Sequence, residues 1–140
     1  MTQKEIELQM QQLNCEYTKK SNAIARRKDE ATQKKQQAII EADDAFHAEK
    51  RSRLEKVVKM RTEKATLFEG DPKREIIEYE ARTIEAEISV MRDDNEQRKR
   101  VISKLAYDEM CALDEESRQL NEWYNSEKLK VMQQYTQDEQ

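Results

Sequence analysis

The chain has 140 residues, of which 40% are charged and 36% are hydrophobic, and it contains one glycine and one proline. A β-sandwich or an α/β domain needs glycine and proline at its many turns, so this composition excludes both classes. It is typical of long, solvated helices, and the length allows one domain. We therefore expect an all-α protein in which residues 1–140 form a single elongated domain.

Charge, cysteine usage and targeting signals indicate the setting of the protein. A net charge of −4 does not favour nucleic acid or an anionic membrane as the main partner. Cys15 and Cys111 are too far apart to suggest a disulfide framework or a zinc site, and two free thiols suit a reducing cytosol. The first residues lack the apolar run of a signal peptide, and no stretch approaches the ~20 apolar residues of a membrane span. These features predict a soluble, cytoplasmic protein without a membrane partner.

A first helix is expected over about residues 3–69. Thr2 and Glu5 have the spacing of a capping box, in which each side chain bonds the backbone N–H of the other residue. Apolar residues then recur at the steps expected for one face of a helix. The positions of this stripe are Ile6, Met10, Leu13, Tyr17, Ile24, Ala31, Ala38, Ala42, Ala45, Leu54, Val57, Val58 and Phe68.

The only glycine and the only proline lie together at the midpoint and predict a hairpin turn over residues 69–72. Gly70 permits the left-handed backbone conformation that closes a helix C-terminus. Asp71 is suited to accept hydrogen bonds from free backbone N–H groups as the N-cap of the next helix. Pro72 then falls at the first helical position, where its missing N–H costs nothing.

A second helix is expected over about residues 72–138. Its apolar stripe alternates steps of four and three along Ile77, Ala81, Ile84, Ile88, Met91, Asn95, Arg98 and Ile102. After a shift near Leu105 and Ala106, the stripe resumes at Met110, Leu113, Ser117, Leu120, Tyr124, Val131 and Tyr135. Such a shift is a stutter, and the repeating stripe indicates a coiled coil rather than a solitary solvated helix. Each helix would be roughly 100 Å long at 1.5 Å per residue.

Charge predicts how the two helices pair. If the chain folds back at residues 70–71, residue i faces roughly residue 141 − i. Residues 18–39 carry seven basic and two acidic side chains, whereas the mirror segment, residues 102–123, carries two basic and six acidic ones. The acidic segment 41–44 likewise mirrors the basic segment 98–100. In a parallel dimer the like charges would lie side by side, so the pattern favours an antiparallel coiled-coil hairpin.

Further apolar residues lie partly off these two stripes, and they bear on the number of chains. A two-helix coiled coil buries only one stripe on each helix, so residues off the stripe require additional helices to cover them. These residues predict self-association into a dimer or a larger multi-helix bundle. They are Ile39, Ile40, Val101, Trp123, Leu129 and Met132.

The residue content excludes most kinds of catalytic and cofactor site. One glycine cannot build the glycine-rich loops that cradle phosphates, and one histidine cannot build a multi-histidine metal centre. Asp44 and His47 have the spacing of a carboxylate–imidazole ligand pair, but a di-iron bundle needs that motif twice and two further glutamates. We therefore expect no catalytic residue, no cofactor and no metal, and we predict that the protein is not an enzyme.

The aromatic residues are the candidate partner interface. Tyr17, Trp123, Tyr124 and Tyr135 fall in the half of the expected hairpin that holds both chain ends, and Tyr17 faces Tyr124. Adjacent Trp123 and Tyr124 point about 100° apart on a helix, so both cannot occupy the centre of one stripe. One ring is expected to face a partner protein, because Trp and Tyr suit interface anchors. The alternative is that the second ring only caps the chain's own stripe.

A second apolar cluster is expected at the turn. It consists of Leu67, Phe68, Ile76 and Ile77. The cluster is expected to close the tip of the hairpin, and the alternative is that it grips a client protein.

Three classes of function fit these features. The favoured one is a non-enzymatic scaffold, spacer or adaptor that acts through protein–protein contacts. The alternative is a holdase or export-type chaperone, because in architecture the hairpin resembles prefoldin subunits and the hairpin stalks of flagellar-type export. Prefoldins, however, carry strand hairpins between their helices, and residues 69–72 leave no room for one. The third is a nucleic-acid-binding coiled coil that uses the basic stretch 19–35, which the mirrored acidic segment and the lack of interleaved aromatics disfavour.

Overall fold

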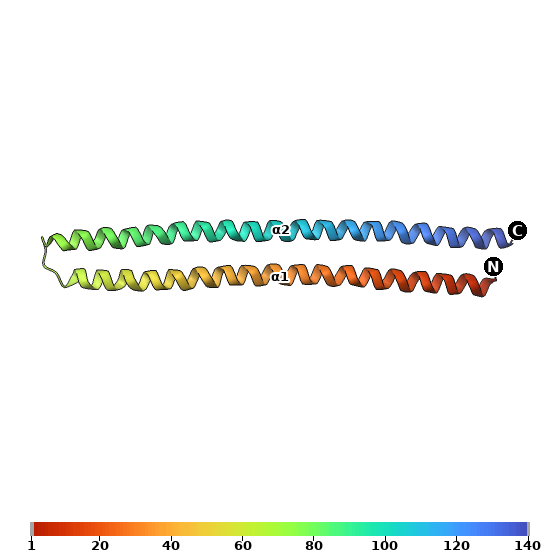
Figure 1. Cartoon of the computed structure of the whole chain (residues 1–140), viewed down its shortest axis with the longest axis horizontal. Helices are drawn as coiled ribbons and strands as arrows, with labels where there is room; N and C mark the ends of the chain where they lie inside the picture. Colours follow the sequence, from red (N-terminus) through yellow and green to blue (C-terminus); the bar gives the residue numbers. More distant parts are fainter. Residues whose placement is uncertain (1, 140) are drawn as a thin grey trace. The chain divides into compact units, whose positions relative to one another are not determined.

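The structure is a computed structural model that describes residues 2–139, with side chains as far as Thr136. It contains two long helices, α1 (Gln3–Ala65) and α2 (Pro72–Glu139), packed against each other in opposite directions (Figure 1). The predicted all-α helical hairpin is therefore confirmed. The chain divides into a terminal unit, residues 1–34 and 105–140, and a loop unit, residues 35–104.

The first helix ends earlier than predicted, at Ala65 instead of residue 69. The backbone N–H of Thr66 donates to the carbonyl of Glu63 at 3.0 Å, and that of Leu67 donates to the carbonyl of Lys64 at 3.1 Å. The Thr66 hydroxyl also donates to the Glu63 carbonyl, at 2.6 Å. These backbone bonds span three residues rather than four, so they tighten the last turn where the helix ends, and the Thr66 hydroxyl bond adds to them. The loop therefore covers residues 66–71 rather than 69–72.

The glycine, aspartate and proline of the loop have distinct roles. Gly70 has a φ of 89° and lies in a turn that is closed by a 3.2 Å bond from the Asp71 N–H to the Phe68 carbonyl. Positive φ at the third position of such a turn favours glycine, so Gly70 shapes the turn and not the end of α1. The Asp71 carboxylate accepts a hydrogen bond from the Lys73 N–H at 2.9 Å, and α2 begins at Pro72. The predicted N-cap and first helical position are both confirmed.

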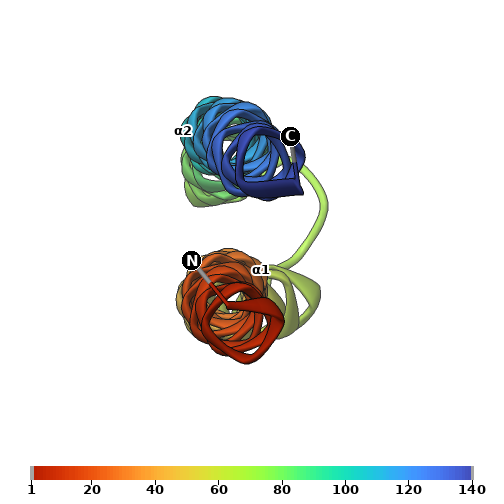
Figure 2. The ribbon, with the colours of Figure 1, turned by 90° about the vertical axis from the view of Figure 1, so that its right-hand side faces the viewer.

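The terminal unit contains the start of α1 and the end of α2. Thr2 and Glu5 form the predicted capping box, with each backbone N–H bonded to the other side chain at 3.3 Å. Leu13, Ala31 and Leu113 are buried between the two helices. This unit faces the viewer in Figure 2, where α1 and α2 lie side by side and no other described element covers their outer sides.

The loop unit has the larger apolar cluster. Val57, Ala81, Ile84 and Ile88 are buried together, and Met60 packs against them. The predicted stripe of α2 is thus confirmed through this region. We call the stripe along which α1 and α2 meet the seam.

Some predicted seam positions are wrong. Leu54, Val58 and Phe68 are exposed. Half-buried Phe46 occupies the seam in place of exposed Ala45, and half-buried Lys99 occupies it in place of exposed Arg98. The seam follows the positions that face the partner helix. Half-buried Arg53 occupies it where α1 has no apolar residue and contacts Glu87 of α2, while half-buried Lys50 lies at its edge. Long basic side chains fill such positions because their aliphatic stems pack while their charges reach water.

The predicted antiparallel charge pairing is confirmed in each unit. In the terminal unit, Arg27 contacts Glu116 at 2.6 Å and Lys28 contacts Asp114 at 2.7 Å. Glu116 and Asp114 also neutralise two bases of the stretch that was considered for nucleic-acid binding. In the loop unit, Lys99 contacts Asp43, as the mirrored segments 41–44 and 98–100 predict. No helix within residues 2–139 combines the length and the apolar character needed to cross a bilayer.

Candidate protein-contact site

Two tyrosines form the centre of the predicted aromatic site. The rings of Tyr17 on α1 and Tyr124 on α2 have centroids 4.5 Å apart and are inclined by 40°. The Tyr17 hydroxyl donates to the Asn121 side-chain oxygen, and the Tyr124 hydroxyl donates to that of Asn14, both at 2.6 Å. The predicted facing of Tyr17 and Tyr124 is therefore observed, and both rings serve contacts within the chain.

The two asparagines were missed in the sequence, although a signal for them is present. Each tyrosine follows an asparagine by three positions, as Asn14 with Tyr17 and Asn121 with Tyr124. Residues three apart lie on one helical face, so each helix presents an Asn and a Tyr together. Antiparallel packing then sets the Asn of one helix opposite the Tyr of the other. The repeated Asn-x-x-Tyr pattern fixes the alignment of the two helices at this point.

Trp123 lies beside this pair on the edge of the seam. Its indole is half-buried, and the Lys20 ammonium lies 4.2 Å from the ring centroid. Lys20 is also paired with Glu16 at 3.1 Å. A shallow groove of about 360 Å³ runs past the indole and is lined by Leu13, Val131 and surrounding polar side chains. Trp123 thus borders a groove, while Tyr135 lies further along α2 and is exposed.

A polar cluster interrupts the seam of the loop unit. Asn95 is buried, and its amide donates to the Asp43 carboxylate at 2.9 Å. Lys99 contacts the same carboxylate at 3.2 Å and Glu96 at 2.9 Å. The hydrogen bonds from Asn95 and Lys99 hold the pKa of Asp43 below its usual range. A buried Asn in a coiled-coil stripe typically fixes the alignment of the helices at a cost in stability.

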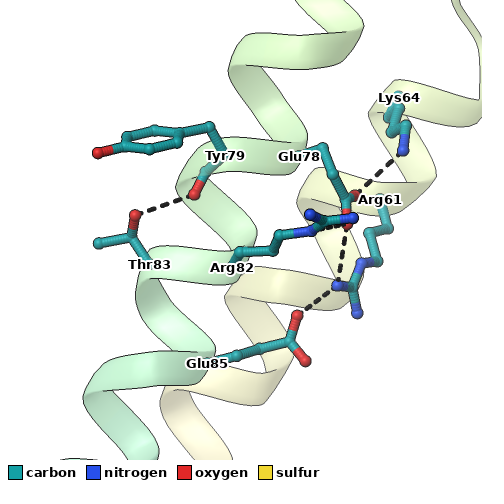
Figure 3. A network of polar contacts seen from close by, with 7 residues as sticks. All are labelled: Arg61, Lys64, Glu78, Tyr79, Arg82, Thr83 and Glu85. Atoms are coloured by element: carbon teal, nitrogen blue, oxygen red, sulfur yellow. Dashed lines mark hydrogen bonds and ion pairs between the residues drawn. The ribbon is translucent and has the colours of Figure 1, made fainter.

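A second network joins the two helices near the loop (Figure 3). Glu78 of α2 accepts contacts from Lys64 at 3.1 Å and from Arg61 at 3.4 Å, and from Arg82 of its own helix at 3.2 Å. Arg61 also bonds Glu85. The bonds from Lys64, followed by those from Arg61, lower the pKa of Glu78 to about 2. The Glu78 carboxylate therefore stays charged far into the acidic range and links α1 to α2.

The predicted cluster at the turn is divided by the structure. Leu67 and Ile77 are half-buried, and the Leu67 carbonyl accepts a hydrogen bond from the Arg74 guanidinium at 2.7 Å. Phe68 and Ile76 are 73% and 57% exposed. Half of the cluster thus helps to close the hairpin, and the other half is presented to solvent.

The residues considered for metal binding and disulfide formation form neither a metal-binding group nor a disulfide within residues 2–139. Within residues 2–139, no three histidine, cysteine or acidic side chains come together as a metal-binding group. His47 is exposed and its ring centroid lies 5.4 Å from that of Phe46. Cys15 and Cys111 are free thiols on exposed positions.

Comparison with known proteins gives no relative from which a role could be transferred. No protein-family model, no curated protein and no solved structure matches the chain. A function is therefore inferred from the contacts and the exposed surfaces of this chain itself.

Proposed function

We propose that this chain is a non-enzymatic coiled-coil assembly protein, a scaffold, spacer or adaptor that self-associates and presents helix faces to protein partners. The observation that carries the proposal is the amount of apolar surface outside the seam. Eight hydrophobic side chains are buried among the described residues, whereas fourteen large ones are exposed. Exposed apolar side chains that recur along one helix face are typical of surfaces that another chain covers.

The positions of these exposed side chains support association along the helices. Of the six residues predicted to lie off the stripes, Ile40, Val101, Leu129 and Met132 are exposed, while Ile39 and Trp123 are half-buried. They occur in both units and on both helices. Additional helices would bury them, as in a multi-helix bundle.

Sedimentation equilibrium at micromolar concentration tests self-association. We expect a mass of at least two chains, accompanied by high helicity in circular dichroism. A highly helical species that sediments with the 16.7 kDa mass of one chain would refute the proposal.

Trp123 is the proposed contact residue for a partner, because its half-buried indole borders the groove of the terminal unit. Truncation of an interface Trp typically costs about 2 kcal/mol or more of binding free energy. Trp123→Ala should therefore weaken assembly or partner binding and leave most of the helix content in place. Tyr107→Ala is a matched control, because Tyr107 is an exposed aromatic of the terminal unit that does not line this groove. If Trp123→Ala instead melts the helices, the indole belongs to the core of the hairpin.

A holdase or export-type chaperone is the second candidate, and the exposed Phe68 and Ile76 beside the loop favour it. A chaperone of this kind would grip unfolded clients with apolar residues at the end of a coiled coil. The aggregation of a denatured test protein distinguishes the two functions. Suppression by the wild-type chain that is lost in Phe68→Ser, with assembly unchanged, would favour the chaperone over the assembly protein.

A further inference from the structure

Two exposed apolar faces of the loop unit carry charges of opposite sign. The first, which we call the basic face, lies on α1 and borders a shallow groove of about 630 Å³. Its apolar residues Leu54 and Val58 are exposed. Three bases and one acid, Glu55, surround them. The bases are Lys50, Arg51 and Lys59.

The second face, which we call the acidic face, lies on α2. Ile76, Tyr79 and Val90 are all more than half exposed and share one side of the helix, because their spacing follows steps of three, four and seven. Figure 3 shows the Tyr79 ring projecting from the side of α2 opposite the contacts of Glu78 with α1. Lys73 and Glu80 lie along one edge of this face, Asp93 lies along the other edge, and Asp94 lies between them. The acids are Glu80, Asp93 and Asp94.

Unlike the charges along the seam, the charges that define these faces have no ion-pair partner among the described residues. Lys64, Arg61 and Glu78 are paired across the two helices. In contrast, none of the three bases and three acids that define the faces has an ion pair with any described residue. Unpaired charges around an apolar patch are the pattern of a surface that meets a complementary surface.

The two faces lie on opposite flanks of the seam. Val58 is three positions from Arg61 on α1, and Arg61 bonds Glu78 on α2, so the basic face shares the flank of Glu78. Ile76 is four positions from Glu80, and Glu80 lies on the other side of the α2 seam from Glu78. One copy of the chain therefore cannot bring its own two faces together.

The two faces lie at the same level along the loop unit. Arg53 contacts Glu87 at 3.5 Å, so residue i of α1 lies level with about residue 140 − i of α2. Residues 54–58 are therefore level with about 82–86, near the middle of the acidic face at 76–90. A second copy displaced sideways, without sliding or inversion, sets its acidic face against the basic face of the first.

We infer that the basic face of one chain binds the acidic face of the next copy of the same chain. This inference rests on the proposed function, because it names the partner and the surface of the proposed self-association. The same alignment sets Lys59 level with Glu80, and Lys50 and Arg51 within about one helical turn of Asp93 and Asp94. Because each copy keeps one unused face, the contact is head-to-tail and builds rings or open arrays rather than closed two-fold dimers.

Charge reversal of each face, alone and in mixture, tests the inference. Lys50→Glu/Arg51→Glu/Lys59→Glu reverses the basic face, and Glu80→Lys/Asp93→Lys/Asp94→Lys reverses the acidic face. Each variant alone should associate more weakly by about tenfold or more in sedimentation velocity, because like charges then oppose each other. An equal mixture of the two should regain wild-type association, since every contact in an alternating array again joins opposite charges. The variant with all six residues reversed should also associate.

The control keeps the charge change and moves it to the other unit. Lys19→Glu/Arg26→Glu/Lys34→Glu changes the net charge by the same amount as reversal of the basic face, at exposed positions of the terminal unit. This variant should assemble as the wild type does, and circular dichroism should show that every variant remains helical.

The outcomes separate this inference from the proposed function. A monomeric wild-type chain would overturn the proposed self-association and the inference with it. A wild-type chain that assembles, with face variants that assemble equally well or a mixture that regains nothing, would overturn the inference alone and leave the proposed function in place.

Discussion

The adjacent valines of α1 offer a direct test of where the seam lies. Val57 is 3% exposed and packs in the apolar cluster of the loop unit, whereas Val58 is 63% exposed. Substitution of either valine by alanine changes the intrinsic helix propensity by the same amount, so the difference between the two variants isolates burial. Loss of two buried carbon groups costs about 0.8 kcal/mol each, and the remaining cavity adds to this. We expect Val57→Ala to be less stable than Val58→Ala by about 2 kcal/mol.

Urea unfolding followed by far-UV circular dichroism measures this difference in the free energy of unfolding. The experiment is best done at low protein concentration, where contacts between copies contribute least. A difference of about 2 kcal/mol is a large part of the stability of a small domain, so it is well within reach of the assay. Equal losses in the two variants, or a larger loss for Val58→Ala, would show that the seam runs along another face of α1.

Two further contacts between the helices give matched tests. Tyr17→Phe and Tyr124→Phe each remove a 2.6 Å hydrogen bond to an asparagine. Each should lower the free energy of unfolding by about 0.5–1.5 kcal/mol. Tyr79→Phe is the control and should leave this free energy unchanged, because Tyr79 is exposed. Glu78 has its pKa lowered from the ordinary 4.5 to about 2, so its stabilising effect is complete above pH 4.5 and is lost as the pH falls towards 2. In thermal unfolding, Glu78→Gln should therefore be less stable than the wild type at neutral pH. The difference in stability between the two should shrink as the pH falls from 4.5 towards 2. A difference that stays constant across this range would contradict the pairing of Glu78 with Lys64.

The direction of the hairpin could be predicted from the sequence because charge patterns act over long segments. Seven bases in residues 18–39 face six acids in residues 102–123, and such an imbalance tolerates an error of several residues in alignment. The capping residues were also predictable, because Thr2 and Asp71 act on backbone groups only a few positions away.

Finer features depend on which side of α1 meets α2, and the residue types of α1 do not decide this. Leu54, Val57 and Val58 are all apolar, so the sequence placed all three in the seam, yet only Val57 is buried there. The stricter stripe of α2 sets the seam, and α1 presents Arg53 to it where no apolar residue falls. The end of α1 at Ala65 was likewise missed, because the bond from the Thr66 hydroxyl to the Glu63 carbonyl is as compatible with a continuing helix as with a helix end.

The misplaced residues of α1 connect the fold to the proposed assembly. Leu54 and Val58 were expected to help hold the hairpin together, and their exposure means that the hairpin folds without them. Apolar residues on a solvated helix raise the risk of unspecific association, and unpaired charges of one sign beside them restrict the partners that fit. The bases near Leu54 and Val58 would repel a second basic face and attract an acidic one. Paired charges along the seam align the two helices within a chain, and in the inferred array the unpaired charges outside it would select and orient the next chain.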